Sequence, residues 1–590
     1  MVNNGEKVGI LPTAAPASIK RPQRSKWRLL GFITLLVVGV AFRYTTKFGP
    51  FSYIPGQLGL HDPKLCPQSD ALYPDRHAKL WESLGDDFNR DAFTKRAVEW
   101  LGGAVRVPTE SYDKMGPVGV DKRWEVFGPF HDYVLQSFPL THATLSLTKV
   151  NTYGLLYEWK GSDNSLKPLL LAAHQDVVPV EPKTVDQWKY PPFSGHYDGE
   201  FIWGRGSSDD KSGLIGALSS IETLLEKNFK PTRTIILSFG FDEEASGVQG
   251  AQSLSRAILD KYGENSIALL VDEGGGFSEV GGSIIAVPGI AEKGYTDTRV
   301  TVSTAGGHSS VPPPHTSIGI LSRLLVEFEA NPIRPRLERD TPIYSTVQCV
   351  GQHAKQFPGR LRALIKASVH SDTALAKLEA ELIKDETYKA LIGTTQAIDL
   401  VQGGVKTNAL PEEAWAVINH RIATQSSVAS VQQRDTEVLK KLSKEFNLTF
   451  TAFGSTISPQ GGSNAGALTL SEAWGTALEP APVTPTGENS APWQLLSGTI
   501  KATYNVHRGL EGADNVFVSP GIMSGNTDTR YYWKLTPHII RYNHWNMGKS
   551  GSALSNGIHT VNERIRAQNF VEVIKFFTML ILNVDETTTF

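Results

Sequence analysis

Cysteine is almost absent from this chain, because its 590 residues contain only Cys66 and Cys349. Two cysteines cannot supply a cysteine-rich zinc module or a framework of several disulfides. A strong net charge is also missing, since 58 basic and 60 acidic residues leave a net charge of −2. This balance gives no basic surface for nucleic acid, so we expect no nucleic-acid partner. Any metal site in the chain must therefore use histidine and carboxylate ligands.

The sequence also lacks Gly-x-Ser-x-Gly, the nucleophile elbow of many serine hydrolases, which argues against that class. Long hydrophobic runs are scarce, but Leu29–Phe42 contains no charged residue. A membrane span needs about 20 residues, and Trp27 and Tyr44 bring the run near that length. Basic residues concentrate before the run, at Lys20, Arg21, Arg24, Lys26 and Arg28. 

This charge bias predicts a transmembrane signal anchor over residues 27–44, with residues 1–26 in the cytoplasm. The protein would then be a single-pass type II membrane protein whose body lies in a lumen or outside the cell. A cleaved signal peptide and a soluble protein are the alternatives, although no small-residue cleavage site follows the run. The sequon Asn447-Leu448-Thr449 agrees with a lumenal, glycosylated body.

Strand-like and helix-like segments alternate between about residues 80 and 290. Leu169–Ala173, Thr234–Phe239 and Ile267–Val271 have the composition of buried strands, while Gly213–Glu226 and Gln249–Tyr262 have helical spacing of apolar residues. Strand, crossover helix and strand in succession predict an α/β fold with a mostly parallel sheet. Such sheets bind ligands beyond the carboxyl ends of their strands.

The pattern changes after Gly294 to short strands and helices, which predicts an inserted α+β domain. We therefore expect a stalk over residues 45–75, a catalytic domain formed by residues 76–292 and 481–590, and a lid domain over 293–480. The second part of the catalytic domain would return His559 to the other ionisable residues.

Ionisable residues follow the predicted strands. His174 and Asp176 are two residues apart and share a face of an extended strand. We interpret His174 as a metal ligand and Asp176 as the carboxylate that orients its imidazole. Asp209 follows a Gly-Arg-Gly loop, and its two oxygens could bridge two cations. Taken singly, these residues could also be a buried core histidine, a turn aspartate and a helix N-cap.

The pair Glu243-Glu244 allows one carboxylate to bind metal while the other acts as a general base. A solvated acidic turn is the alternative for this pair. Asp272 and Glu273 end the next strand, and either could bind a second metal. His559 precedes a final amphipathic helix and would complete the set. Two histidines and several carboxylates that converge on one point predict a site for two divalent cations.

The motifs together resemble the two-zinc carboxypeptidase/aminoacylase superfamily, and within it the carboxypeptidase S group of fungal vacuoles. The matching segments occur in family order over about residues 80–580. They are His174-Gln175-Asp176, the segment 204–211, Asp242-Glu243-Glu244, the segment 271–275, the segment 306–310, the segment 403–408, the segment 526–530, and His559 with Asn562-Glu563-Arg564.

The resemblance implies a role for each site residue. Two Zn²⁺ per chain would be held by His174, Asp209, Glu244, His559 and Asp272, with Glu273 as the alternative to Asp272. Glu243 would be the general base and Asp176 the orienting residue. His308, Asn408 and Arg421 would bind substrate from the lid. The family also has a cis peptide after the bridging aspartate, which corresponds to Asp209–Asp210 here.

The implied activity is that of a zinc-dependent metallocarboxypeptidase that releases C-terminal residues from small peptides. The alternative is an amidase that hydrolyses or forms N-acyl amino acids, because both substrates carry an amide beside a free carboxylate. A membrane-tethered receptor on an inactive peptidase fold is disfavoured, because every expected ligand is present. The resemblance further implies a vacuolar lumen as the location and a homodimer formed through the lid domain.

Overall fold

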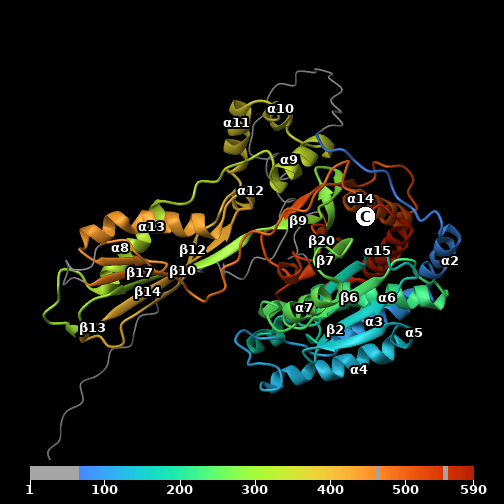
Figure 1. The fold of residues 1–590 in the computed structure, drawn as a ribbon, viewed down its shortest axis with the longest axis horizontal. Coiled ribbons are helices and arrows are strands. Elements are labelled where there is room, and N and C mark those ends of the chain that lie inside the picture. The colour runs from blue at the N-terminus through green and yellow to red at the C-terminus, as the bar shows by residue number, and fades with distance from the viewer. Residues whose placement is uncertain (1–64, 459–465, 549–555) are drawn as a thin grey trace, which may run out of the picture. The chain divides into compact units, whose positions relative to one another are not determined.

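A computed structural model describes residues 65–458, 466–548 and 556–590. Its largest sheet has ten strands, and its main path runs β1-β2-β6-β3-β7-β20-β9-β19 (Figure 1). The strands on this path are β1 Ser146–Val150, β2 Gly154–Trp159, β6 Ile235–Gly240, β3 Leu169–His174, β7 Leu269–Val280, β20 Ile539–Asn546, β9 Gly289–Glu292 and β19 Gly521–Met523. Two further strands, β8 Ser283–Ala286 and β18 Phe517–Val518, pair beside it. The predicted anchor over residues 27–44 lies outside the described residues.

The sheet is mixed rather than mostly parallel. Strands β6, β3, β7 and β20 at its centre are parallel, as the alternating sequence pattern predicts. Strands β1 and β2 join them through antiparallel pairing, because a short turn connects these two strands. The central strands β3 and β6 are buried along their whole length, which explains their continuous apolar sequence.

Helices cover both faces of this sheet. On one face α15 packs against α6, α14, α3 and β20, and on the other α7 packs against β6 and β2. The helices of this domain are α2 Ala78–Phe88, α3 Asp91–Val105, α4 Phe127–Ser137, α5 Pro139–Thr144, α6 Lys211–Glu226, α7 Ala251–Tyr262, α14 Ala491–Arg508 and α15 Ala567–Glu586. Within the described residues, α15 alone is long and apolar enough to cross a membrane, and 89% of its most apolar stretch is buried in the protein. It is therefore a core helix here.

The lid domain has a six-stranded sheet with its own hydrophobic core. The strand order is β12-β14-β10-β17-β15-β16. These strands are β12 Ala397–Gly403, β14 Glu413–Ile422, β10 Gly294–Ser303, β17 Ala467–Glu472, β15 Thr449–Ala452 and β16 Ser455–Thr456. Helices α8 Ser317–Ala330 and α13 Val428–Glu445 cover one face of this sheet (Figure 1). Residues of β10 alternate between buried and half-buried, so one face of the strand packs on these helices.

Four helices inside the predicted lid segment do not belong to the lid core. They are α9 Pro342–His353, α10 Gly359–Ser368, α11 Asp372–Leu382 and α12 Glu386–Ile392. Their apolar residues, such as Tyr344 and Leu378, join the core of the catalytic domain. The predicted boundaries of 293–480 therefore enclose two structural units, because helical periodicity does not reveal which core a helix packs against.

The start of the described chain is attached to these helices and is not a free stalk. Cys66 forms a disulfide with Cys349 of α9, with 5.0 Å between their Cα atoms. Gln68 exchanges two hydrogen bonds with the backbone of Val518, and the amide of Leu72 donates to Gly498. Residues 65–75 therefore pack on the body, contrary to the sequence-based expectation, because contacts distant in sequence hold them there.

Candidate active site

Three neighbouring parallel strands, β3, β6 and β7, bring the predicted residues together. In the pairing of β3 with β6, His174 lies opposite Gly240, and in the pairing of β3 with β7, Leu171 lies opposite Val271. Strands β3 and β6 therefore end side by side, whereas β7 continues to Val280, so Asp272 and Glu273 lie within it and do not end it as the sequence suggests. His174 is the last residue of β3, and the segment Asp242–Glu244 follows β6. Parallel pairing in this register is the reason that residues distant in sequence meet here.

Two imidazoles face the two oxygens of one carboxylate. His174 Nε2 lies 3.2 Å from Asp209 Oδ1, and His559 Nε2 lies 3.1 Å from Asp209 Oδ2. His559 Nε2 is also 3.2 Å from Glu244 Oε1, while His174 Nε2 is 3.7 Å from Glu273 Oε2. Asp209 therefore occupies the central position that a bridging ligand requires. The peptide Asp209–Asp210 is cis, as the family resemblance predicts.

Asp209 reaches this position because its neighbour provides the helix cap. Asp210, not Asp209, is the N-cap of α6, and its carboxylate accepts a hydrogen bond from Gly213 N. Asn543 also donates to Asp210 Oδ1 at 2.8 Å. The alternative interpretation of Asp209 as a helix cap is therefore wrong, since the cap lies one residue further along.

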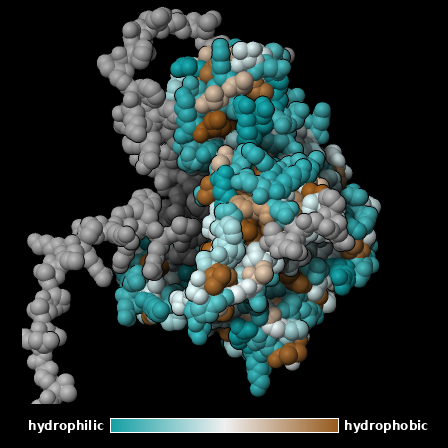
Figure 2. Space-filling view, turned by 90° about the vertical axis from the view of Figure 1, so that its left-hand side faces the viewer, coloured by the Kyte–Doolittle hydropathy of each residue, from teal (hydrophilic) through white to brown (hydrophobic). Residues whose placement is uncertain are grey.

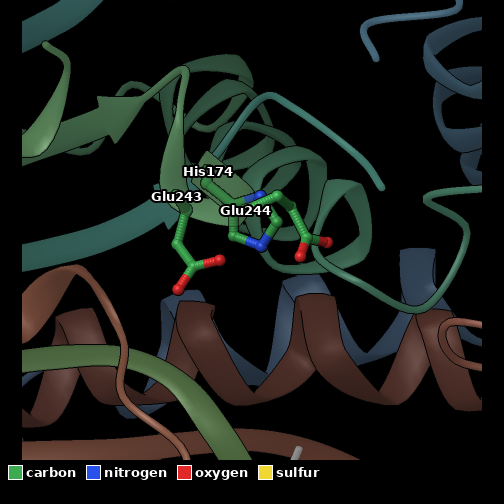
Figure 3. A group of neighbouring side chains, drawn as sticks. All are labelled: His174, Glu243 and Glu244. Carbon is green, nitrogen blue, oxygen red and sulfur yellow. The ribbon is translucent and has the colours of Figure 1, made fainter. Parts of the chain in front are cut away.

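The two glutamates lie in a 3₁₀ turn, Glu243–Ala245, rather than in the extended segment that the sequence suggests. Figure 3 shows His174, Glu243 and Glu244 from the end of β3 and this turn, with the imidazole between the two carboxylates in the view. Ligand atoms of these three residues lie within 4.8 Å of one another. By distance alone Glu243 could therefore bind a cation as well as act as a base.

Asp176 organises the turn that carries both glutamates. Its carboxylate accepts hydrogen bonds from the backbone amides of Glu243 and Glu244, both at 3.1 Å, and from the Ser111 hydroxyl at 2.6 Å. The nearest oxygen to His174 Nδ1 is the Asp176 backbone carbonyl at 2.9 Å, whereas its carboxylate lies at 3.4 Å. Asp176 thus orients the imidazole partly through its main chain, and it also positions the base.

The structure distinguishes the two candidates for the fifth ligand. Glu273 belongs to a group with His174 and Asp209 whose ligand atoms lie within 4.8 Å of one another. Asp272 is absent from such groups within the described residues, and its strand neighbour on β20 is Arg541. Adjacent residues of a strand point to opposite faces, so only one of the pair can face the cluster. The geometry therefore favours Glu273, the alternative to Asp272, as the candidate for the fifth ligand.

The donor set suits cations on electrostatic grounds. Burial, and then repulsion from Glu273, raises the pKa of Glu243 well above its ordinary value, and burial likewise raises the pKa of Glu273. Burial opposes a charged His174, but the carboxylates of Glu273, Asp176 and Asp209 raise its pKa well above the usual range. The cluster thus holds more carboxylates than two imidazoles can balance. Divalent cations would supply the missing positive charge through ligands that they prefer.

Two guanidinium groups from different domains interact electrostatically with each other. Arg421 of β14 donates to Asn526 Oδ1 at 3.3 Å, and Arg530 follows in the same loop as Asn526. Burial, together with the neighbouring Arg530 charge, lowers the pKa of Arg421. Within the described residues, neither guanidinium has an ion pair with a carboxylate.

The other two predicted substrate-binding residues lie elsewhere in the lid. His308 of β11, Gly307–His308, pairs with Ala409 of β13, Ala409–Leu410, and its side chain is exposed. Asn408 precedes β13 and is also exposed. Neither side chain has a hydrogen bond to the carboxylate–histidine cluster among the residues that the structure describes.

The sequence analysis assigned no roles to Ser111, Arg205 and Glu563, although Glu563 lies within a motif next to His559.

The sequence of this chain matches the model of a known protein family. The model described as peptidase family M20/M25/M40 matches residues 170–583. The chain belongs to this family. Carboxypeptidase S of Saccharomyces cerevisiae is 40% identical over 588 residues, which cover 96% of this chain and 98% of that protein. The expected family and its α/β peptidase fold are thereby confirmed.

Two other proteins are similar to this chain, one in sequence and one in fold. The N-fatty-acyl-amino acid synthase/hydrolase PM20D1 of Mus musculus is 30% identical over 493 residues, 82% of this chain and 87% of that protein. The crystal structure of the M20 family metallo-carboxypeptidase Sso-CP2 from Sulfolobus solfataricus has a TM-score of 0.52 at 18% sequence identity. It covers 83% of this chain and 99% of its own, so it shares the fold.

Replacement of Glu273 by Gln should reduce metal binding, because an amide is a weaker ligand than a carboxylate. The matched variant Asp272→Asn, one residue away and also buried, should leave metal content close to that of the wild type. Elemental analysis of both proteins after zinc reconstitution measures the difference. Loss of metal in Asp272→Asn with full retention in Glu273→Gln would reverse the assignment.

Proposed function

We propose that this metallocarboxypeptidase holds two zinc ions between the ends of β3 and β6, residue Glu273 within β7, and the His559 segment. His174 and Glu273 would bind one ion, Glu244 and His559 the other, and Asp209 both. The observation that carries the proposal is the position of Asp209, whose two oxygens face one imidazole each. Carboxylate and imidazole donors in this combination are typical of zinc sites.

Glu243 has the position and environment of the general base. Zinc, when bound, would supply a Lewis acid that polarises the scissile carbonyl and acidifies water. Glu243 accepts the proton of the attacking water and returns it to the departing amine, so that the amide bond breaks and a carboxylate forms. The backbone amide of Glu243 is fixed by Asp176, which holds this carboxylate in place between the two transfers.

Glu243→Gln should abolish turnover while leaving zinc binding nearly intact. Glutamine keeps the size of the side chain but cannot accept the proton, so we expect a loss of about 10²–10⁴-fold in kcat. Glu244→Gln is the matched control and should instead weaken zinc binding, because Glu244 contacts His559. Turnover and bound zinc are measured on both variants. A Glu243→Gln protein that lost zinc but regained activity in excess zinc would contradict these roles.

The guanidinium groups of Arg421 and Arg530, which have no ion pair within the described residues, support selection for a free carboxylate. The ring of Tyr295 of β10 lies 5.6 Å from the Arg421 guanidinium carbon, and Arg530 interacts electrostatically with both residues. A guanidinium binds a carboxylate through two parallel hydrogen bonds. We place the C-terminal carboxylate of a small peptide here, with Arg421 as its main ligand. That assignment orients the last peptide bond of the substrate toward Glu243.

Arg421→Ala should weaken the preference for a free C-terminal carboxylate over an amide. Loss of a charge-assisted pair of hydrogen bonds costs about 1.5–3 kcal/mol, or roughly 10–150-fold in relative kcat/KM. The ratio of kcat/KM for a free-acid peptide and its amidated form measures the effect, with Arg530→Ala compared in parallel. If only Arg530→Ala reduces the ratio, Arg530 and not Arg421 is the main ligand.

N-acyl amino acids are the alternative substrates. They present the same amide beside a carboxylate, and the similarity to a protein named as an N-fatty-acyl-amino acid synthase/hydrolase favours testing them. The greater similarity to a carboxypeptidase favours peptides. A panel of dipeptides and fatty-acyl amino acids assayed on one preparation would separate the two substrate classes, and faster cleavage of the acyl compounds would overturn the peptide assignment.

A homodimer through the lid would bring His308 to a second active site. Strand β12 is the end strand of the lid sheet, and its residues Leu400 and Val401 are 46% and 69% exposed. An open apolar edge of this kind favours pairing with another strand. The face in Figure 2 is mostly hydrophilic with separate hydrophobic patches. A monomeric mass in solution would exclude the dimer.

We also place the body on the non-cytosolic side of a membrane, with residues 1–26 cytoplasmic and the vacuolar lumen as the destination. Disulfides persist in oxidising compartments, and Cys66 pairs with Cys349. Asn447 of the sequon is exposed in the turn between α13 and β15, where a glycan could attach. Treatment with an endoglycosidase should change the electrophoretic mobility of the wild type but not that of Asn447→Gln, and this comparison tests the topology. An unglycosylated protein with two free thiols would contradict it.

A further inference from the structure

Glu563 is wholly buried, and its carboxylate is surrounded by donors from a single loop. Its Oε1 accepts hydrogen bonds from the backbone amides of Gly206, Ser208 and Asp209, at 3.0, 2.9 and 3.2 Å. Its Oε2 accepts from the Arg205 guanidinium at 2.7 Å. Four donors on one carboxylate fix the course of the loop that ends at Asp209, because each broken bond would leave a buried polar group unpaired.

The main chain around Glu563 adds a second connection to the same loop. The carbonyl of Glu563 accepts from Gly204 N at 2.9 Å, and Arg564 pairs with Trp203 where β21, Arg564–Arg566, meets β5, Phe201–Trp203. The Ser208 hydroxyl donates to the Arg564 carbonyl. The segment that carries His559 and the loop that carries Asp209 are therefore joined on both sides of the Glu563 side chain.

We infer that Glu563 is a positioning residue that sets the spacing between Asp209 and His559. These two side chains lie on segments more than 300 residues apart in sequence, yet His559 Nε2 lies 3.1 Å from Asp209 Oδ2. Glu563 follows His559 by four residues and binds the amide of Asp209 itself. It touches neither imidazole, so it acts through the backbone of the ligands. The inference rests on the proposed function, in which both residues bind the same zinc ion.

The chemistry of the contact selects glutamate. Glutamine has one carbonyl oxygen, so it can satisfy either the three backbone amides or Arg205, and its NH₂ group then faces a donor. Aspartate keeps both oxygens but is one methylene shorter, while the Glu563 backbone is held by Gly204. Both replacements should therefore loosen the loop and with it the bridging carboxylate.

The test measures zinc affinity independently of activity. Apparent zinc affinity of metal-free wild type, Glu563→Gln and Glu563→Asp is determined by competition with a chromophoric chelator, and melting of the metal-free proteins is recorded. Residues that orient metal ligands typically change affinity by about 10–100-fold when replaced. We expect a loss of this size in Glu563→Gln. Glu563→Asp provides the same comparison if the glutamine variant does not fold.

Glu572 is the matched control, because it is equally buried and accepts two hydrogen bonds from Arg508, at 2.5 and 3.1 Å, away from the zinc ligands. Glu572→Gln should lower the melting temperature and leave zinc affinity unchanged. Equal affinity losses in Glu563→Gln and Glu572→Gln would overturn the inference, as would wild-type affinity in both Glu563 variants. Failure of the wild type itself to bind two zinc ions would instead overturn the proposed function.

Discussion

The mutual repulsion of buried carboxylates is the constraint on which the rest of the active site depends. Asp176, Asp209, Glu243, Glu244 and Glu273 lie around two imidazoles at one sheet edge. Placing these groups together without cations is unfavourable, and the pKa values of Glu243 and Glu273 are raised first by burial and then by neighbouring carboxylates. The surrounding fold must therefore hold the side chains in place until cations bind.

The fold meets this constraint because it fixes the backbone of the segments that carry the cluster carboxylates, and not only their side chains. Asp176 binds the amides of the turn that carries Glu243 and Glu244, and Glu563 binds the amides of the loop that carries Asp209. In both cases an outer carboxylate organises a segment whose own carboxylate points to the centre. Backbone donors are suited to this task because they are already fixed by the secondary structure that follows them.

The candidate site residues come from both domains. The catalytic domain supplies the carboxylates and imidazoles, and the lid supplies Arg421, which contacts Asn526 of the catalytic domain. Helices α9–α12 are encoded between lid strands but pack on the catalytic core, and the disulfide fixes the N-terminal segment to them. The lid segment is thus connected to the body through the Arg421–Asn526 contact and through this helical unit.

The sequence alone was sufficient to predict the central parallel strands and the family of the chain. It also indicated nearly all the residues of the cluster. Continuous apolar runs define the strands, and ionisable residues at their ends stand out because such residues rarely end buried strands without a role. The side-chain spacing also predicted the helix Gly213–Glu226, which the structure extends by only two residues at its start.

Tertiary structure decided what depends on partners distant in sequence. The choice of Glu273 over Asp272 follows from which face of β7 meets His174, and one residue of register reverses it. The attachment of residues 65–75, the division of the predicted lid and the role of Glu563 likewise depend on contacts across hundreds of residues. Local patterns record the secondary structure that a segment favours, whereas these features arise only when separate segments pack together.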